Sequence, residues 1–140
     1  MNLRGGRQMR LGRIAAAVAT YRSFVLKSGC TWTRPELPDM YRVNFATALL
    51  LHGHPAGCLS ILAEVRDPGD PGVLSLRAEI AAWEKRLSWW HRLNWRFGRI
   101  EPAVAPPVLS NPGVLESTAH RFSSTPPTAA ASVAGVSTVL

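Results

Sequence analysis

This sequence has few residues that could form covalent or metal cross-links, and it lacks the common catalytic motifs. Its two cysteines, Cys30 and Cys58, are too few for a disulfide framework and do not form a CxxC unit. No GxSxG, no glycine-rich phosphate loop and no HExxH occurs. The sequence therefore predicts no catalytic residue, no metal ligand set and no cofactor, and we expect a protein that is not an enzyme.

Long apolar runs are also missing. No run approaches the ~20 residues that a membrane-spanning helix needs. An Arg-rich start precedes "IAAAVA" in the manner of a signal peptide, but Tyr21 and Arg22 end that apolar stretch early, which disfavours secretion. Together with two cysteines outside any disulfide framework, which are typically buried and reduced, this pattern predicts a cytoplasmic protein.

The apolar residues that are present lie between Ile14 and Phe97, and the hydrophobic fraction of 46% supports a real core. Beyond that point the chain is rich in Pro, Ser, Thr, Ala and Val, and repeated proline opposes regular helix. We therefore expect three segments. They are a basic N-terminal arm at 1–13, a helical domain at 14–98 and a disordered tail at 99–140.

The net charge of +7 is distributed unevenly. Residues 1–13 contain four Arg and no acid, residues 73–100 are also basic, and residues 39–72 are slightly acidic. Basic ends of this kind can attract nucleic acid or lipid headgroups. However, fourteen of the sixteen basic residues are Arg, which codon usage can also produce. Nucleic-acid binding and membrane-surface binding are therefore alternatives that the sequence alone disfavours.

Apolar periodicity predicts helices and no strand. Asp39 and Ser88 are expected N-caps, Pro55 suits a first helical turn, and "DPGDPG" is a break. The pattern indicates an all-α fold. The expected helices cover 14–28, 39–52, 55–66 and 73–87, followed by a last one that ends at Gly98.

The stretch "LLLHGHPAGCLSIL" could be a metal site or a helix corner. His52, His54 and Cys58 lie close together, but a zinc site needs about four converging ligands, and no paired cluster supplies the rest. Gly53 and Pro55 are the residues that a turn between two helices requires. The sequence therefore predicts a corner with Gly53 at positive φ and Cys58 on a packed face.

The segment "WEKRLSWWHRLNWRF" mixes aromatic and basic residues. Such mixing can stack nucleic-acid bases or lie at a lipid interface. Burial is the favoured alternative, because Trp83, Trp90 and Phe97 are spaced by seven and continue the apolar seam of the preceding helix. This interpretation leaves Trp89 and Trp95 partly exposed. The seam begins with Val73, Leu76 and Ile80.

The corner and its flanks resemble a tetratricopeptide repeat, a helix pair of roughly 34 residues. Ala46, Gly53 and Cys58 match the order of small residues in that family, and Leu62 matches the bulky residue that follows. Prolines at 68 and 71 then end the unit. More loosely, "RVNFATALLLHGHPAGCLSIL" followed by "WWHRLNWRFG" is similar to uncharacterised bacterial proteins that carry such repeats.

The resemblance implies a short bundle of antiparallel helix pairs. It also implies a protein–protein interaction module whose partner is a protein or peptide. Its groove would lie between the helices at 39–52 and 73–87, with Thr47, Arg77 and Glu84 as polar contacts. The helix at 14–28 would be the second helix of a unit that lacks its first, as in a fragment of a longer array. One of its faces would then be bare, so the resemblance also implies self-association through this helix.

Overall fold

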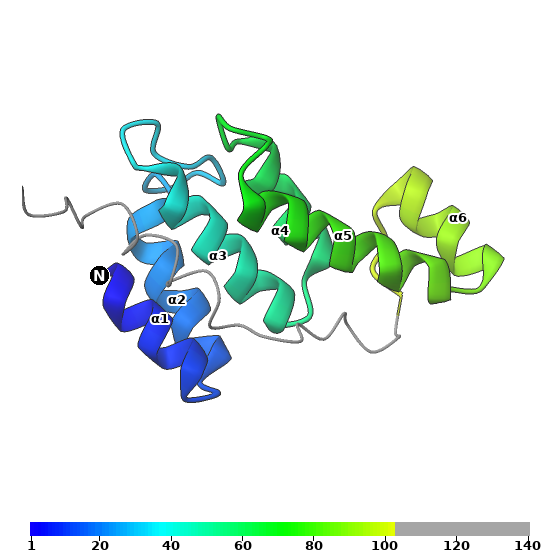
Figure 1. Ribbon diagram of the computed structural model, residues 1–140, viewed down its shortest axis with the longest axis horizontal. Helices are drawn as coiled ribbons and strands as arrows, with labels where there is room; N and C mark the ends of the chain where they lie inside the picture. The colour runs from blue at the N-terminus through cyan, green and yellow to red at the C-terminus, as the bar shows by residue number, and fades with distance from the viewer. Residues whose placement is uncertain (103–140) are drawn as a thin grey trace, which may run out of the picture.

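The computed structural model describes residues 1–102 and consists of six α-helices (Figure 1). Within that range the only β pairing is one isolated bridge between Leu26 and Thr33. The predicted all-α class is therefore confirmed. The expected disordered tail falls almost entirely outside the described residues. The helices are α1 (Asn2–Arg10), α2 (Ile14–Val25), α3 (Asp39–Leu51), α4 (Pro55–Ala63), α5 (Pro71–Arg86) and α6 (Trp89–Gly98).

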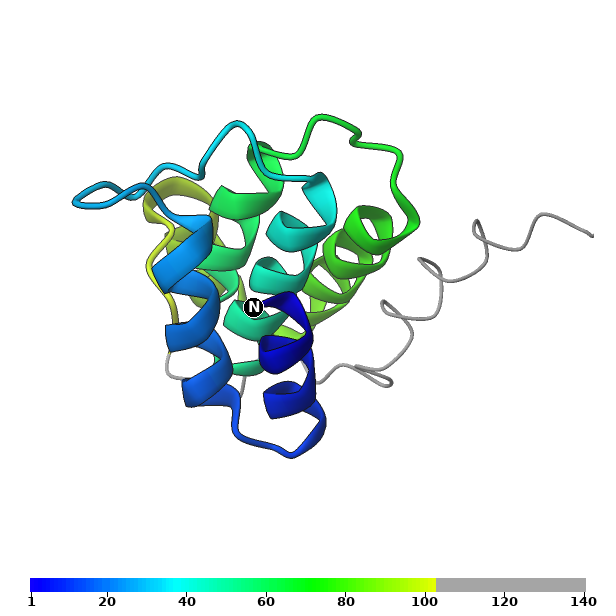
Figure 2. The same cartoon turned by 90° about the vertical axis from the view of Figure 1, so that its left-hand side faces the viewer.

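Helix α3 is the centre of the molecule. It packs against α1, α2, α4 and α5, and every residue from Arg42 to Leu50 is buried (Figures 1 and 2). Val43, Ala46, Leu49 and Leu50 of this helix are all part of the core. A helix that is buried on all sides has no face left for a partner.

The segment at 1–13 is not merely a basic arm, because most of it forms helix α1. Its inner side consists of Gly5, Gly6 and Met9, which are buried. A Cβ atom on Gly5 would lie 2.5 Å from the ring of Tyr21, so glycine is what lets α1 approach α2 this closely. Asn2 completes the contact by accepting hydrogen bonds from the Tyr21 hydroxyl, at 3.2 Å, and from the Asn44 amide, at 3.0 Å.

Helix α1 also covers the face of α2 that was expected to be bare. Ala17, Tyr21 and Val25 have no exposed surface, and α2 packs against both α1 and α3. The expectation that no earlier helix packs on α2 was therefore wrong, although Ile14 and Val18 stay partly exposed. Self-association through this helix stays a prediction. The helix also ends at Val25, three residues before the expected end at Ser28.

A polar network fastens the loop between α2 and α3 to the rest of the bundle. The buried guanidinium of Arg42 donates to the Thr33 hydroxyl at 2.8 Å and to Asp39 at 2.6 Å. Glu64 accepts from the amide and the hydroxyl of Thr33. Asp39 is therefore not the N-cap that we predicted. It is the first residue of α3, and its second oxygen accepts from the backbone amide of Arg66 at 3.0 Å.

The starts of α4 and α5 follow from local chemistry, and α5 begins two residues before the expected start at Val73. Pro55 opens α4, and Asp70 caps α5 by accepting from the amides of Gly72 and Val73. Helix α4 ends at Ala63, three residues before the expected end. Among the described residues, no helix is both long enough and apolar enough to cross a bilayer.

Candidate docking surface

The candidate site is the arm formed by the end of α5 and by α6, which projects from the bundle (Figure 1). Leu87 and Ser88 have extended backbone, with ψ values of 145° and 157°, and this breaks the helix between Arg86 and Trp89. The Ser88 hydroxyl then accepts a long hydrogen bond, 3.5 Å, from the amide of His91. Ser88 is therefore the N-cap of α6, as predicted.

One face of α6 packs against α5. Trp95 is 1% exposed, and its ring meets that of Trp83 edge to face, with 5.3 Å between centroids. Leu87, at the junction, is also buried. These aromatic side chains fix α6 to the end of α5, since edge-to-face pairs add to the stabilisation that burial alone provides.

The basic side chains of α6 are used within the arm. Arg92 donates to the carbonyl oxygens of Lys85 at 2.8 Å and Leu87 at 3.2 Å, groups that are left without partners where α5 ends. Arg96 pairs with Glu84. The guanidinium of Arg99 lies 5.3 Å from the centre of the Trp95 ring. The arm is thus held by polar as well as apolar contacts.

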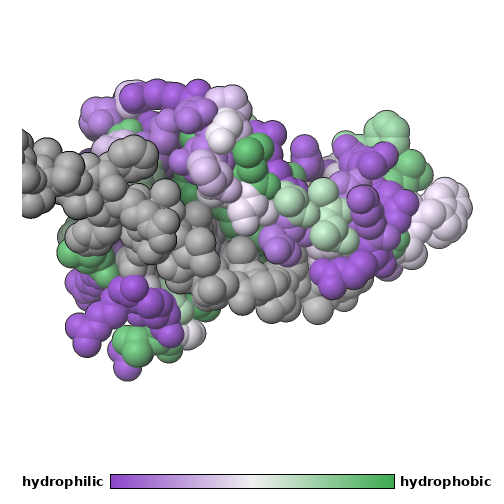
Figure 3. Space-filling model, in the orientation of Figure 1, coloured by the Kyte–Doolittle hydropathy of each residue, from purple (hydrophilic) through white to green (hydrophobic). Residues whose placement is uncertain are grey.

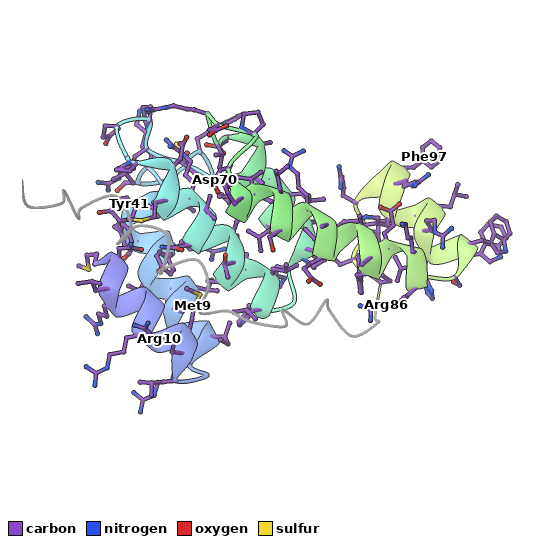
Figure 4. The ribbon with its side chains drawn as sticks, viewed as in Figure 1. Met9, Arg10, Tyr41, Asp70, Arg86 and Phe97 are labelled. Atoms are coloured by element: carbon purple, nitrogen blue, oxygen red, sulfur yellow. The ribbon has the colours of Figure 1, made fainter. Side chains whose placement is uncertain are left out.

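The opposite face of α6 is apolar and exposed. Trp89, Trp90, Leu93 and Phe97 are 62%, 60%, 39% and 85% exposed, and we call these four residues the α6 outer face. The two tryptophan rings stack on each other with 3.9 Å between centroids. Figure 4 shows Phe97 pointing away from the helices, and Figure 3 shows a small hydrophobic area among hydrophilic side chains at this end of the molecule. A contiguous exposed apolar surface is typical of an interaction site.

The predicted inward-facing aromatic residues were partly wrong. Trp83 is buried, but Trp90 and Phe97 are exposed, and Trp95 is the buried residue. A spacing of seven keeps residues on one face only if the helix is continuous. The break at Leu87 and Ser88 rotates the following helix, so the seam of α5 does not extend into α6.

The three predicted partner contacts do not form one surface. Thr47 has no exposed surface, and its hydroxyl donates to the carbonyl of Val43 at 2.9 Å, so it cannot contact a partner. Arg77 is exposed on α5. Glu84 is engaged by Arg96. The sequence missed the α6 outer face, although Ser88 was a signal that a new helix begins there.

The corner between α3 and α4 has the predicted geometry. Gly53 has a φ of 88°, and Ala46, Cys58 and Leu62 are buried around it. Burial raises the pKa of the Cys58 thiol to about 12, so this cysteine is not a thiolate at neutral pH.

The two histidines of the corner lie on its outside. His52 and His54 are exposed and stack on each other with 5.0 Å between ring centroids. Within residues 1–102, no three His, Cys, Asp or Glu side chains are grouped so that they could hold a metal ion. The chain matches no family model, no curated protein and no solved structure, so the function has to be inferred from the geometry of the arm.

Proposed function

We propose that this protein is a non-enzymatic protein–protein interaction module that binds its partner through the α6 outer face. The observation that carries the proposal is the spacing of Trp90, Leu93 and Phe97, which are exposed at positions i, i+3 and i+7 of one helix. This is the anchor pattern of a helix that lays its apolar face into a groove on another protein. Tryptophan and other large aromatic side chains are also the usual hot spots of such interfaces.

The arm presents these anchors in a preformed helix. Because Trp95, Arg92 and Arg96 hold α6 against α5, binding does not require the helix to become ordered first. A preformed helix retains more of its contact energy as affinity than a disordered segment does.

The charge around α6 indicates the chemistry of the partner. Residues 85–100 contain five basic residues and no acid. We therefore expect an apolar groove with carboxylates at its rim, because opposite charges at the rim speed association and exclude wrong partners. A second copy of this arm is a poor occupant, since it would bring like charges together.

A protein groove is favoured over a lipid surface for this face. Arg92 and Arg96 already donate to groups of the arm, so fewer of their N–H groups are free to bind phosphates directly, although their positive charge still acts on a partner at a distance. The helix-pair architecture supports the repeat-like interpretation, because α1–α2 and α3–α4 are joined by short turns and α5–α6 closes through the two tryptophans. The groove expected between α3 and α5 is replaced in this proposal by the outer face of the last helix.

Photocrosslinking in extract of the source cells tests the proposal. Phe97→benzoylphenylalanine should give a discrete protein adduct, whereas Ala78→benzoylphenylalanine, at an exposed position of α5, should not. The adduct partner, once purified, should bind the wild-type protein directly. Trp90→Ser should weaken that binding about 30-fold, the effect of losing a hot spot of about 2 kcal/mol. Equal adduct yields at both positions would contradict the proposal. An affinity that is unchanged in Trp90→Ser would contradict it as well.

A further inference from the structure

A second exposed surface lies on α1, at the other end of the molecule from α6 (Figure 1). With Gly5, Gly6 and Met9 turned inward, the outer side of α1 carries Leu3, Arg4, Arg7 and Arg10, and Leu11 follows directly. We call these five residues the α1 outer face. Leu3 and Leu11 are 78% and 59% exposed. Figure 3 shows hydrophilic and hydrophobic side chains next to one another over this helix.

Two arginines of this surface, Arg4 and Arg7, are free to bind a ligand, unlike the arginines of α6. Within the part of the chain that the structure describes, the side chains of Arg4, Arg7 and Arg13 are exposed and make no hydrogen bond or ion pair. The surrounding sequence adds no negative charge, since the first acidic residue of the chain is Glu36. The α1 outer face is therefore complementary to an anionic surface.

The two leucines indicate which anionic surface fits. They stand at the two ends of the α1 outer face, with the arginines between them. On a nucleic-acid backbone these leucines would gain nothing, because the phosphates are surrounded by water. At a lipid interface their side chains enter the boundary between headgroups and acyl chains while the arginines contact phosphates. A second copy of the chain would oppose arginine to arginine.

We propose that the α1 outer face docks the protein on anionic lipid headgroups. Arg4 and Arg7 contact the phosphates, and Leu3 and Leu11 insert beside them. The helix has nine residues, so the contact is weak, reversible and sensitive to salt. This surface is separate from the α6 outer face, and the proposal does not depend on the protein partner.

Cosedimentation of the full chain with phosphatidylcholine vesicles, with and without phosphatidylglycerol, tests this proposal. Binding should require phosphatidylglycerol. Each arginine near a charged membrane contributes about 1 kcal/mol, which is about fivefold in the partition coefficient. Arg4→Gln/Arg7→Gln should therefore weaken binding about 25-fold. Leu3→Ser/Leu11→Ser keeps the charge and should weaken binding as well.

Three comparisons decide the outcome. Arg77→Gln/Arg86→Gln removes the same charge from exposed positions of α5 and should bind like the wild type. An equal loss in this control would show a general charge effect and overturn the proposal. Loss in Trp90→Ser/Phe97→Ser, but not in the α1 variants, would assign the lipid contact to α6. Tighter binding to duplex DNA than to vesicles, unaffected by Leu3→Ser/Leu11→Ser, would assign a nucleic acid instead.

Discussion

Gly53 is the residue on which the corner between α3 and α4 depends. Its φ of 88° lies in a region where side chains with a Cβ atom are strained. We expect Gly53→Val to lower the free energy of unfolding by more than about 1 kcal/mol, measured by urea denaturation. His52→Ala and His54→Ala should have almost no effect, because both side chains are exposed. A large loss in the histidine variants, reversed by zinc, would contradict this picture.

The two cysteines should differ in reactivity. Cys30 is exposed, whereas Cys58 is buried and has a pKa raised to about 12 by that burial. In the native protein at pH 8, iodoacetamide should modify Cys30 alone, and unfolding in urea should expose the second thiol. Mass spectrometry counts the labels, and rapid double labelling of the native protein would show that the corner opens.

The same burial links Cys58 to stability at high pH. Burial raises the pKa of the thiol in the folded protein to about 12, whereas a cysteine in the unfolded chain loses its proton near its ordinary pKa of 9.0. The unfolded state therefore binds fewer protons in this window, and stability falls as the pH rises. Compared with Cys58→Ala, the wild type should lose free energy of unfolding between about pH 9 and 12, and parallel pH profiles for the two would contradict it.

Residue-level chemistry was the most predictable part of this fold. Gly53, Pro55 and Ser88 act through their own backbone or side chain on the next few residues, so the sequence identifies them without knowledge of the fold. Asp39 was wrongly predicted as an N-cap because its oxygens accept hydrogen bonds from residues far along the chain as well as from near ones. It accepts from Arg42 and from the amide of Arg66.

Helix α1 is held by a close approach that glycine permits. Gly5→Ala would place a methyl group 2.5 Å from the fully buried ring of Tyr21, which cannot move aside without opening the core. We expect α1 to detach, so that trypsin cleaves after Arg7 and Arg10 faster than in the wild type.

Gly57→Ala is the matched control for this change. Its Cβ would be 3.5 Å from Leu49, an ordinary contact, so stability should stay the same or rise slightly. If Gly5→Ala cleaves no faster than this control, α1 is not packed as described.

Helix boundaries and phases were harder to predict than helix existence. The inner side of α1 consists mainly of glycines, so its burial leaves no apolar pattern in the sequence. In the arm, a break of two residues left Trp90 exposed and Trp95 buried, the reverse of the prediction. Both errors have one cause. Periodicity records which residues share a face of a continuous helix, but not how one helix is placed against another.

At the scale of the whole molecule, the two proposed surfaces lie at opposite ends (Figure 1). The α1 outer face offers the unpaired arginines Arg4 and Arg7, whereas the α6 outer face offers aromatic anchors whose neighbouring arginines are already bonded. If both proposals hold, lipid binding and partner binding should be independent. Variants of one surface should leave the affinity of the other unchanged, and competition between vesicles and the protein partner would show that they share a surface.

The central place of α3 has a further consequence for which parts of the protein unfold locally. Four helices surround α3, whereas α6 is attached mainly to the end of α5 and exposes its other side. Opening α3 to solvent requires the whole bundle to unfold, but α6 can lift away by itself. Backbone amides of α6 should therefore exchange with deuterium long before those of α3. Partner binding should slow amide exchange in α6 and leave the exchange rates of the other helices unchanged. The exchange rate of α6 would then measure how much of the protein has its partner bound.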